Sequence, residues 1–355
     1  MSPTAVSTAP RSPRRVALTR STGAFRRFTL LVVISLVLIA AGGILGLMIG
    51  SHSIPAGTVL EALRAYDPGI DDHRIVILSR LPRTVIALLV GLALGLAGSL
   101  MQSVTRNPLA DPGLLGVNAG ASAAVVVAIA FLGVSTVQGY IWFAFGGAAL
   151  TSLLVYMLGS AHRSAATPAR LALAGAAVSV ALGAVVGAIL ISHEQAFNAF
   201  RYWAVGSTLG RGLDVALVVL PFIGVGVLVS IVLIPSLNAV ALGEDVARSI
   251  GATPGLARAG SALAVVLLAG AATAAAGPIG FVGLAAPHIV RAIVGPDHRY
   301  LIPGVLVVGP AFLVVADVIG RAVVAPQELQ TGISVAILGG PLFVALVRSR
   351  RMAAL

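Results

Sequence analysis

A run of 23 residues, Phe28–Gly50, contains no charged side chain. A transmembrane helix needs about 20 mostly apolar residues, whereas the apolar core of a signal peptide has only about 7–15. The run therefore predicts an uncleaved first membrane span. Comparable apolar runs recur to the end of the chain, and the expected fold is an all-α polytopic membrane protein of about ten transmembrane helices. The predicted spans are 28–50, 84–104, 114–132, 140–159, 171–192, 214–234, 257–275, 278–294, 301–322 and 332–347.

The composition agrees with a membrane protein and excludes several kinds of site. Charged residues make up 10% of the chain, against about 25% in soluble domains. The chain has no cysteine, which excludes disulfides and thiolate metal sites. It also has no lysine, so it cannot form a Walker A loop, whose lysine holds the nucleotide phosphates. Any ATP that drives this protein must bind another chain.

The distribution of the arginines predicts the orientation of the chain in the membrane. With ten spans, both ends lie on one side, which receives 16 of the 23 arginines. The positive-inside rule places that side in the cytosol. Residues 1–27 are then a disordered, arginine-rich cytosolic tail, residues 350–355 a cytosolic C-terminus, and residues 52–83 an external loop with a short helix near Leu60–Tyr66.

A polar segment, Ala241–Ala252, interrupts two long apolar runs on the predicted cytosolic side. Leu242, Val246 and Ile250 are spaced i, i+4 and i+8, which predicts one apolar stripe on a three-turn amphipathic helix. Acidic residues suit its first turn, and Gly251 is typical of a helix end. The segment is either an interfacial helix that caps the bundle or a docking site for a partner.

Several motifs, in order, resemble those of the FecCD-type permeases. They include RLPR at Arg80–Arg83, GSLMQSVTRNPLADPGLLGVNAGA at Gly98–Ala121, GPIGFVGLAAPHIVR at Gly277–Arg291 and ADVIGR at Ala316–Arg321. The resemblance runs from about residue 28 to 349. One departure is ELQTG at Glu328–Gly332, where the family usually has ELPVG. The family comprises membrane subunits of ABC importers for iron-siderophores, haem and cobalamin.

This resemblance implies the assembly and its substrate. Residues 28–349 would form a type II permease domain, with a cytosolic coupling loop at about 236–256. The expected partners are a second permease subunit, identical or paralogous, two ATP-binding subunits and an external substrate-binding lipoprotein. The complex would lie in the bacterial inner or plasma membrane. Ferric siderophore is the leading substrate, with cobalamin or haem as alternatives. We expect no enzymatic activity, cofactor or nucleic acid on this chain, with ATP and magnesium held by the ATPase.

The resemblance also implies roles for individual residues. The first group would couple to the ATPase, and its members are Leu242, Gly243, Glu244, Asp245, Val246, Arg248, Ile250 and Gly251. The second group would dock the external binding protein and comprises Arg80, Arg83 and Arg321. The third group would narrow the cytosolic end of the pathway and comprises Asn107, Pro108, Leu109 and Thr167, although Asn107-Pro108 is also a common turn signal.

Two polar residues within predicted spans have competing interpretations. Asp317 could relay protons in a secondary transporter, because an intramembrane carboxylate is costly and often functional. It also lies one helical turn before Arg321, which favours a structural ion pair. His288 is most simply a packing residue, and we identify no catalytic or metal-binding constellation. The stretch Gly277–Val290, rich in glycine and proline, predicts an irregular or broken helix.

Overall fold

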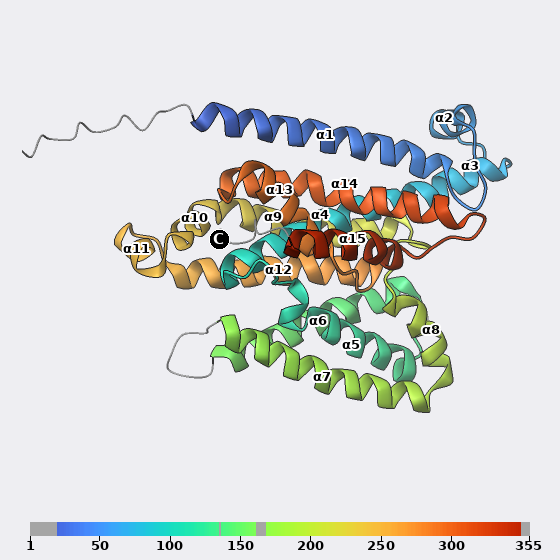
Figure 1. Cartoon of the computed structure of the whole chain (residues 1–355). Helices are drawn as coiled ribbons and strands as arrows, with labels where there is room; N and C mark the ends of the chain where they lie inside the picture. Colours follow the sequence, from blue (N-terminus) through green and yellow to red (C-terminus); the bar gives the residue numbers. More distant parts are fainter. Residues whose placement is uncertain (1–19, 135, 161–167, 349–355) are drawn as a thin grey trace, which may run out of the picture.

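The computed structural model describes residues 20–134, 136–160 and 168–348, and these residues form helices without strands. Figure 1 shows long helices side by side, with their axes aligned along one common direction and the chain passing back and forth between the two ends. The elements are α1 (Arg20–Met48), α2 (Ala56–Arg64), α3 (Asp71–Ile75), a π-helical turn (Val76–Arg80), α4 (Leu81–Thr105), a 3₁₀ turn (Pro112–Leu115), α5 (Val117–Leu132), α6 (Val137–Ser160), α7 (Pro168–Ser192), α8 (Glu194–Ala204), α9 (Leu213–Val232), α10 (Ile234–Ala241), α11 (Glu244–Ser249), α12 (Pro254–Ala276), α13 (Val282–Val294), α14 (His298–Val324) and α15 (Thr331–Arg348).

Each of the ten predicted spans coincides with one helix, which confirms the all-α membrane fold. Within the described residues, seven helices have the length and composition to cross a membrane: α1, the continuous α3–α4 helix, α6, α7, α9, α12 and α14. The other three, α5, α13 and α15, are shorter apolar helices. Apolar composition thus identified the segments correctly, but a run of residues does not fix how far the helix extends.

Two predicted boundaries are wrong. Helix α1 begins at Arg20, so residues 20–27 of the predicted tail are helical, while residues 1–19 lie outside the described residues. The predicted external loop 52–83 ends early, because Asp71 starts a helix that continues through the π-helical turn into α4. Asp71 and Asp72 occupy its first turn, where negative charge favours the helix dipole. The short helix expected near residues 60–66 is α2.

Helix α4 lies at the centre of the bundle and packs through glycines. A Cβ added to Gly91 would lie 2.6 Å from the carbonyl oxygen of Gly309 in α14. A Cβ on Gly98 would likewise collide with the backbone of Gly283 in α13. Small residues allow such backbone approach between membrane helices. The contacts hold α4, α13 and α14 together as the core on which the functional segments are mounted.

The irregularity predicted for Gly277–Val290 is confined to its first five residues, since Val282–Val294 form the continuous helix α13. Gly277 has a φ of +76°, and the chain remains non-helical through Phe281, whose φ is +65°. Gly277 and Ile279 in this segment are buried by protein, and Ser207 donates its N–H to the carbonyl oxygen of Ala276, 2.6 Å away. Such burial is how non-helical backbone is tolerated at membrane depth.

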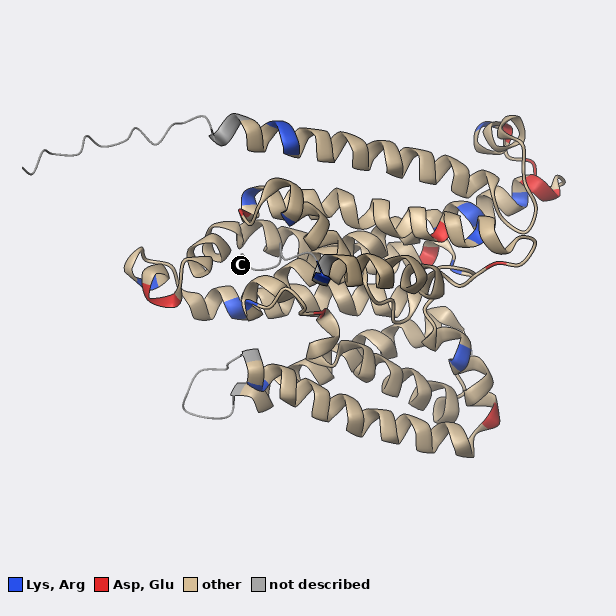
Figure 2. Cartoon of the chain, in the orientation of Figure 1, with Lys and Arg blue, Asp and Glu red and all other residues tan. Residues whose placement is uncertain are grey.

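Charged residues gather at the two ends of the bundle (Figure 2). One end carries α10, α11 and the start of α1, and we call it the α11 end (Figure 1). The other carries α2, α3 and α8, and we call it the α2 end. Helix α15 runs from the side of the α2 end toward the α11 end. The first and last described residues therefore both lie toward the α11 end.

Candidate coupling surface and ion cluster

Helix α11 is held between two glycines at the α11 end of the bundle. Gly243 precedes it with a φ of +111°, and Gly251 follows it with a φ of +82°. Both values favour glycine, which has no Cβ to clash. The helix spans only Glu244–Ser249, so the predicted three-turn helix is too long, although the predicted glycine stop is confirmed.

The apolar stripe of this segment faces away from the protein. Leu242, Val246 and Ile250 have exposed fractions of 66%, 47% and 62%. We call these three residues the coupling surface. Ala247 is instead fully buried and packs with Ala239, Val240 and Ala257. Ala247, and not the stripe, therefore anchors α11 on this chain.

The charged residues of α11 are paired with one another and with α12. Glu244 accepts hydrogen bonds from Arg248 and from Arg258 in α12, each at 3.0 Å. Arg248 also donates to the fully exposed Asp245 at 3.1 Å. Exposed pairs contribute about 0.2–1 kcal/mol each. These charges orient α11 on α12 and leave the coupling surface free.

Polar contacts connect α10, the helix before α11, to the core. Asn238 Oδ1 lies 2.8 Å from His298 Nδ1 and accepts the His298 backbone N–H at 3.0 Å. His298 Nε2 lies 2.7 Å from Ser103 Oγ in α4. Arg106, after α4, donates to the carbonyl oxygen of Val240 at 2.8 Å. The segment that carries the coupling surface is therefore joined to α4 and α14.

A second buried network joins α4 to α13. Gln102 Nε2 donates to the Gly283 carbonyl oxygen at 3.0 Å, and Arg291 donates to Gln102 Oε1 at 2.7 Å. Gln102, Gly283 and Arg291 all lie in the family-like motifs, but the sequence pattern indicated no role for them. His288, on the same helix α13, is buried with its Nδ1 2.8 Å from the Leu284 carbonyl oxygen, as a packing residue would be.

An ion cluster lies near the α2 end, and Asp317 is its centre. Arg83 donates to both carboxylate oxygens of Asp317, with its Nη2 2.8 Å from Oδ1, and Arg321 Nη2 lies 2.8 Å from Oδ2. Thr331 donates to Oδ1 at 2.8 Å, and Arg83 also pairs with Glu328. Asp317 is 1% exposed. The expected intrahelical Asp317–Arg321 pair is confirmed.

Two arginines of this region cap the end of α1. Arg321 donates to the carbonyl oxygens of Gly46 and Ile49, at 2.8 and 3.1 Å. Arg80 donates to those of Leu47 and Met48, at 2.9 and 2.7 Å. The last carbonyls of a helix lack intrahelical partners, and positive charge there favours the helix dipole.

These contacts change the interpretation of the predicted docking residues. Arg80, Arg83 and Arg321 are all buried, whereas the docking hypothesis requires arginines exposed at the external mouth. Sequence analysis predicted their common end of the bundle but not their burial. Each reaches carbonyl or carboxylate groups supplied by distant segments, and this removes it from the surface. Their role in docking stays a prediction.

The predicted gate residues fall in the connection after α4. Asn107 Oδ1 accepts the Leu109 N–H at 2.9 Å, so Asn107-Pro108 forms the turn that the dipeptide indicates. Thr167 lies outside the described residues. Asp111, missed by sequence analysis, accepts the Gly113 N–H at 2.8 Å. Burial raises the pKa of the Asp111 carboxyl above its usual value, and the hydrogen bond from Gly113 partly opposes this.

Comparisons of sequence and structure with known proteins identify the family of this chain. The FecCD transport family model matches residues 36–349. The ferric enterobactin transport system permease protein FepD of Escherichia coli K12 is 42% identical over 89% of this chain and 94% of its own. The probable siderophore transport system permease protein YfiZ of Bacillus subtilis 168 is 39% identical, over 82% and 87%. An inward-facing metal-chelate type ABC transporter has a TM-score of 0.76 and 26% identity, over 90% and 99%. The chain belongs to the FecCD transport family and is a metal-chelate transport permease.

Proposed function

We propose that this chain is the permease subunit of an ATP-driven importer for a ferric siderophore, delivered by an external binding protein. The observation that carries the coupling mechanism is the coupling surface. Val246 projects from α11, and Leu242 and Ile250 project from the chain just before and just after it, with all three side chains exposed on the described chain. Apolar side chains projecting from a charged, extramembranous segment fit the groove of another protein. That protein is the ATPase, since this chain has no lysine for a phosphate-binding loop.

The contacts of α10 provide a route for the motion of the ATPase to reach the spans. A displacement of α11 pulls on α12 through the Glu244–Arg258 pair. It also acts on α14 and α4 through Asn238, His298 and Ser103. Small shifts at such a site are converted into alternative helix packings because close-packed interfaces do not deform continuously. This is alternating access, with the α11 end in the cytosol, as the positive-inside rule indicates.

The exposed face of α7 is suited to the second permease subunit. Only 11% of the residues in its most apolar 18-residue stretch are buried by the described chain. Ala176, Val180, Gly183 and Gly187 are spaced four, three and four residues apart, so they share one stripe of the helix. A Cβ at Gly183 or Gly187 meets nothing within 4 Å. Small residues at this spacing let a second membrane helix approach closely.

Replacing Gly183 by Leu tests this interface. The side chain has space in the single chain, so folding is expected to persist, but it overpacks a helix pair. Overpacking costs about 1–3 kcal/mol, which weakens permease dimerisation roughly 5- to 150-fold. Gly224 in α9 has equal space around it, so Gly224→Leu is the matched control. Dimerisation measured by single-molecule photobleaching in vesicles should fall only for Gly183→Leu; equal dimerisation of both variants would exclude this stripe.

The names of the relatives support the proposed substrate, and the ion cluster around Asp317 supports ATP rather than protons as the energy source. One relative described above is named for ferric enterobactin transport and the other for probable siderophore transport, and these names support a ferric siderophore as the substrate. Haem and cobalamin are the alternatives for this chain. The competing proton-driven mechanism uses Asp317. Both oxygens of that carboxylate already contact arginines, so a proton would have to displace a strong ion pair.

Transport in vesicles distinguishes the two energy sources. We expect a ferric siderophore to enter proteoliposomes only when the permease, its ATPase, the binding protein and ATP with magnesium are present. A pH gradient alone should give no uptake. Uptake by the permease alone under a pH gradient would contradict the proposal, and ATP-dependent uptake of haem or cobalamin but of no siderophore would correct the substrate.

A further inference from the structure

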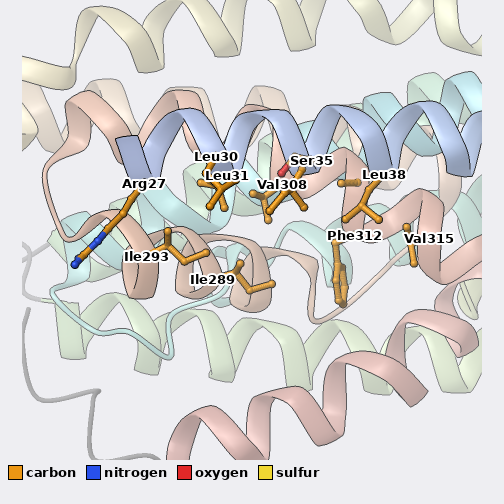
Figure 3. Close-up of a pocket in the computed structure, with 12 residues that line it drawn as sticks. Arg27, Leu30, Leu31, Ser35, Leu38, Ile289, Ile293, Val308, Phe312 and Val315 are labelled. Atoms are coloured by element: carbon orange, nitrogen blue, oxygen red, sulfur yellow. The ribbon is translucent and has the colours of Figure 1, made fainter. Parts of the chain in front are cut away.

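An apolar groove runs along α1 on the half of the bundle nearest the α11 end. It has a volume of about 330 Å³ and lies between α1, α13 and α14. Leu31 and Leu38 line it from α1, Ile289 from α13, and Phe312 from α14 (Figure 3). Only 22% of the residues in the most apolar 18-residue stretch of α1 are buried. The groove therefore opens beside a helix that faces the lipid.

The length and depth of the groove match one leaflet of a bilayer. Its lining on α1 extends from Arg27 to Leu38. The eleven steps between these residues, at a rise of about 1.5 Å each, span about 16.5 Å, and one leaflet occupies about half of the 30 Å hydrocarbon core. A single acyl chain lying along α1 therefore has an apolar wall over its whole depth.

A positive charge lies at the mouth of this groove. Arg27 is exposed at the start of the lining, and Figure 3 shows its guanidinium extending away from α1. Arg26 precedes it, and Arg299 is next to Tyr300, whose ring contacts Phe28 with centroids 5.4 Å apart. Within residues 20–134, 136–160 and 168–348, none of these three arginines has an ion-pair partner.

We propose that this groove is a binding site for an anionic glycerophospholipid. One acyl chain lies along α1, and the headgroup phosphate binds the Arg27 guanidinium, which offers planar, bidentate donors to phosphate oxygens. A zwitterionic lipid places a second, positive group beside the unpaired arginines and gains less. Basic residues between transmembrane helices at the headgroup level bind anionic lipids on the same physical basis.

The test is native mass spectrometry of the full chain, delipidated in detergent and titrated with palmitoyl-oleoyl phosphatidylglycerol or with phosphatidylcholine of the same chains. Arg27→Gln should weaken phosphatidylglycerol binding about fivefold, since one interfacial arginine contributes about 1 kcal/mol. Phosphatidylcholine binding should fall by a smaller factor, because its positive group reduces what the phosphate gains from Arg27. Arg26→Gln removes a neighbouring charge that does not line the groove, so its effect should stay below about twofold. Equal losses in both variants would overturn the proposal, as would equal affinity of the wild-type protein for the two lipids.

A second pair of variants tests the groove itself. Ile34 lines the groove, whereas Ile44 on the same helix does not, and both side chains are exposed. Ile34→Trp should reduce phosphatidylglycerol binding without lowering thermal stability, and Ile44→Trp should reduce neither. If Ile34→Trp lowers the fraction of permease dimers and leaves bound lipid unchanged, the groove is a protein interface and the lipid proposal fails.

Discussion

Replacing Asp317 by Asn is expected to destabilise the folded protein by about 3–5 kcal/mol, the usual cost of breaking a buried ion pair from one side. The variant keeps the size of the side chain but removes its charge. Arg83 and Arg321 would then lose the carboxylate that both contact at 2.8 Å, and they would face each other in a buried site. Glu328 pairs directly with Arg83 and not with Arg321. The measurement is thermal unfolding of the purified permease in a fixed detergent and lipid mixture.

The matched control is Asp214→Asn. Asp214 is also near the α2 end and also accepts a side-chain hydrogen bond, from Gln138 at 2.7 Å, but it is exposed. Its replacement should change stability by less than about 0.5 kcal/mol. A proton relay at Asp317 gives a different pattern, in which Asp317→Asn unfolds like the wild-type protein and loses only transport. That pattern would contradict the structural role assigned here.

Replacing Val246 by Asp is expected to abolish ATPase association and transport while the permease still folds. Val246 is 47% exposed in the single chain, so the new charge remains hydrated there. In the complex, the variant loses the burial of an apolar side chain, worth about 1.5–3 kcal/mol. It also leaves an unpaired charge in the contact, which adds a desolvation cost. The measurement is co-purification of the ATPase and of the binding protein from the same membranes.

Leu60→Asp serves as the control at the opposite end of the bundle. Leu60 lies on α2 and has the same exposed fraction, 47%. Its replacement should leave ATPase association intact. Normal ATPase association in Val246→Asp would show that α11 only caps the bundle. If Val246→Asp loses both the ATPase and the binding protein, the test uses Leu242→Gln and Ile250→Gln, which add no charge. These variants should still reduce ATPase association, and normal association in both would contradict the coupling role.

Sequence alone located the helices and the exposed segment around α11. Each predicted span coincides with a helix because the hydrocarbon core demands long apolar segments whose backbone bonds are satisfied internally. Gly251 likewise marked the C-terminal end of α11, since it adopts a φ that favours glycine. The break after α12 followed from local glycines as well. These features depend on neighbouring residues, which a single sequence displays directly.

Only the tertiary structure decided which polar and apolar groups find partners. Arg83 and Asp317 are 234 residues apart, and no local pattern indicates that they meet. The stripe of Leu242, Val246 and Ile250 was correctly grouped, but periodicity cannot say whether a stripe faces the same chain or another protein. The helix packing that buries Ala247 and the arginines at the end of α1 makes that choice. Residue spacing determines which side chains share a face, and packing between distant segments determines what that face contacts.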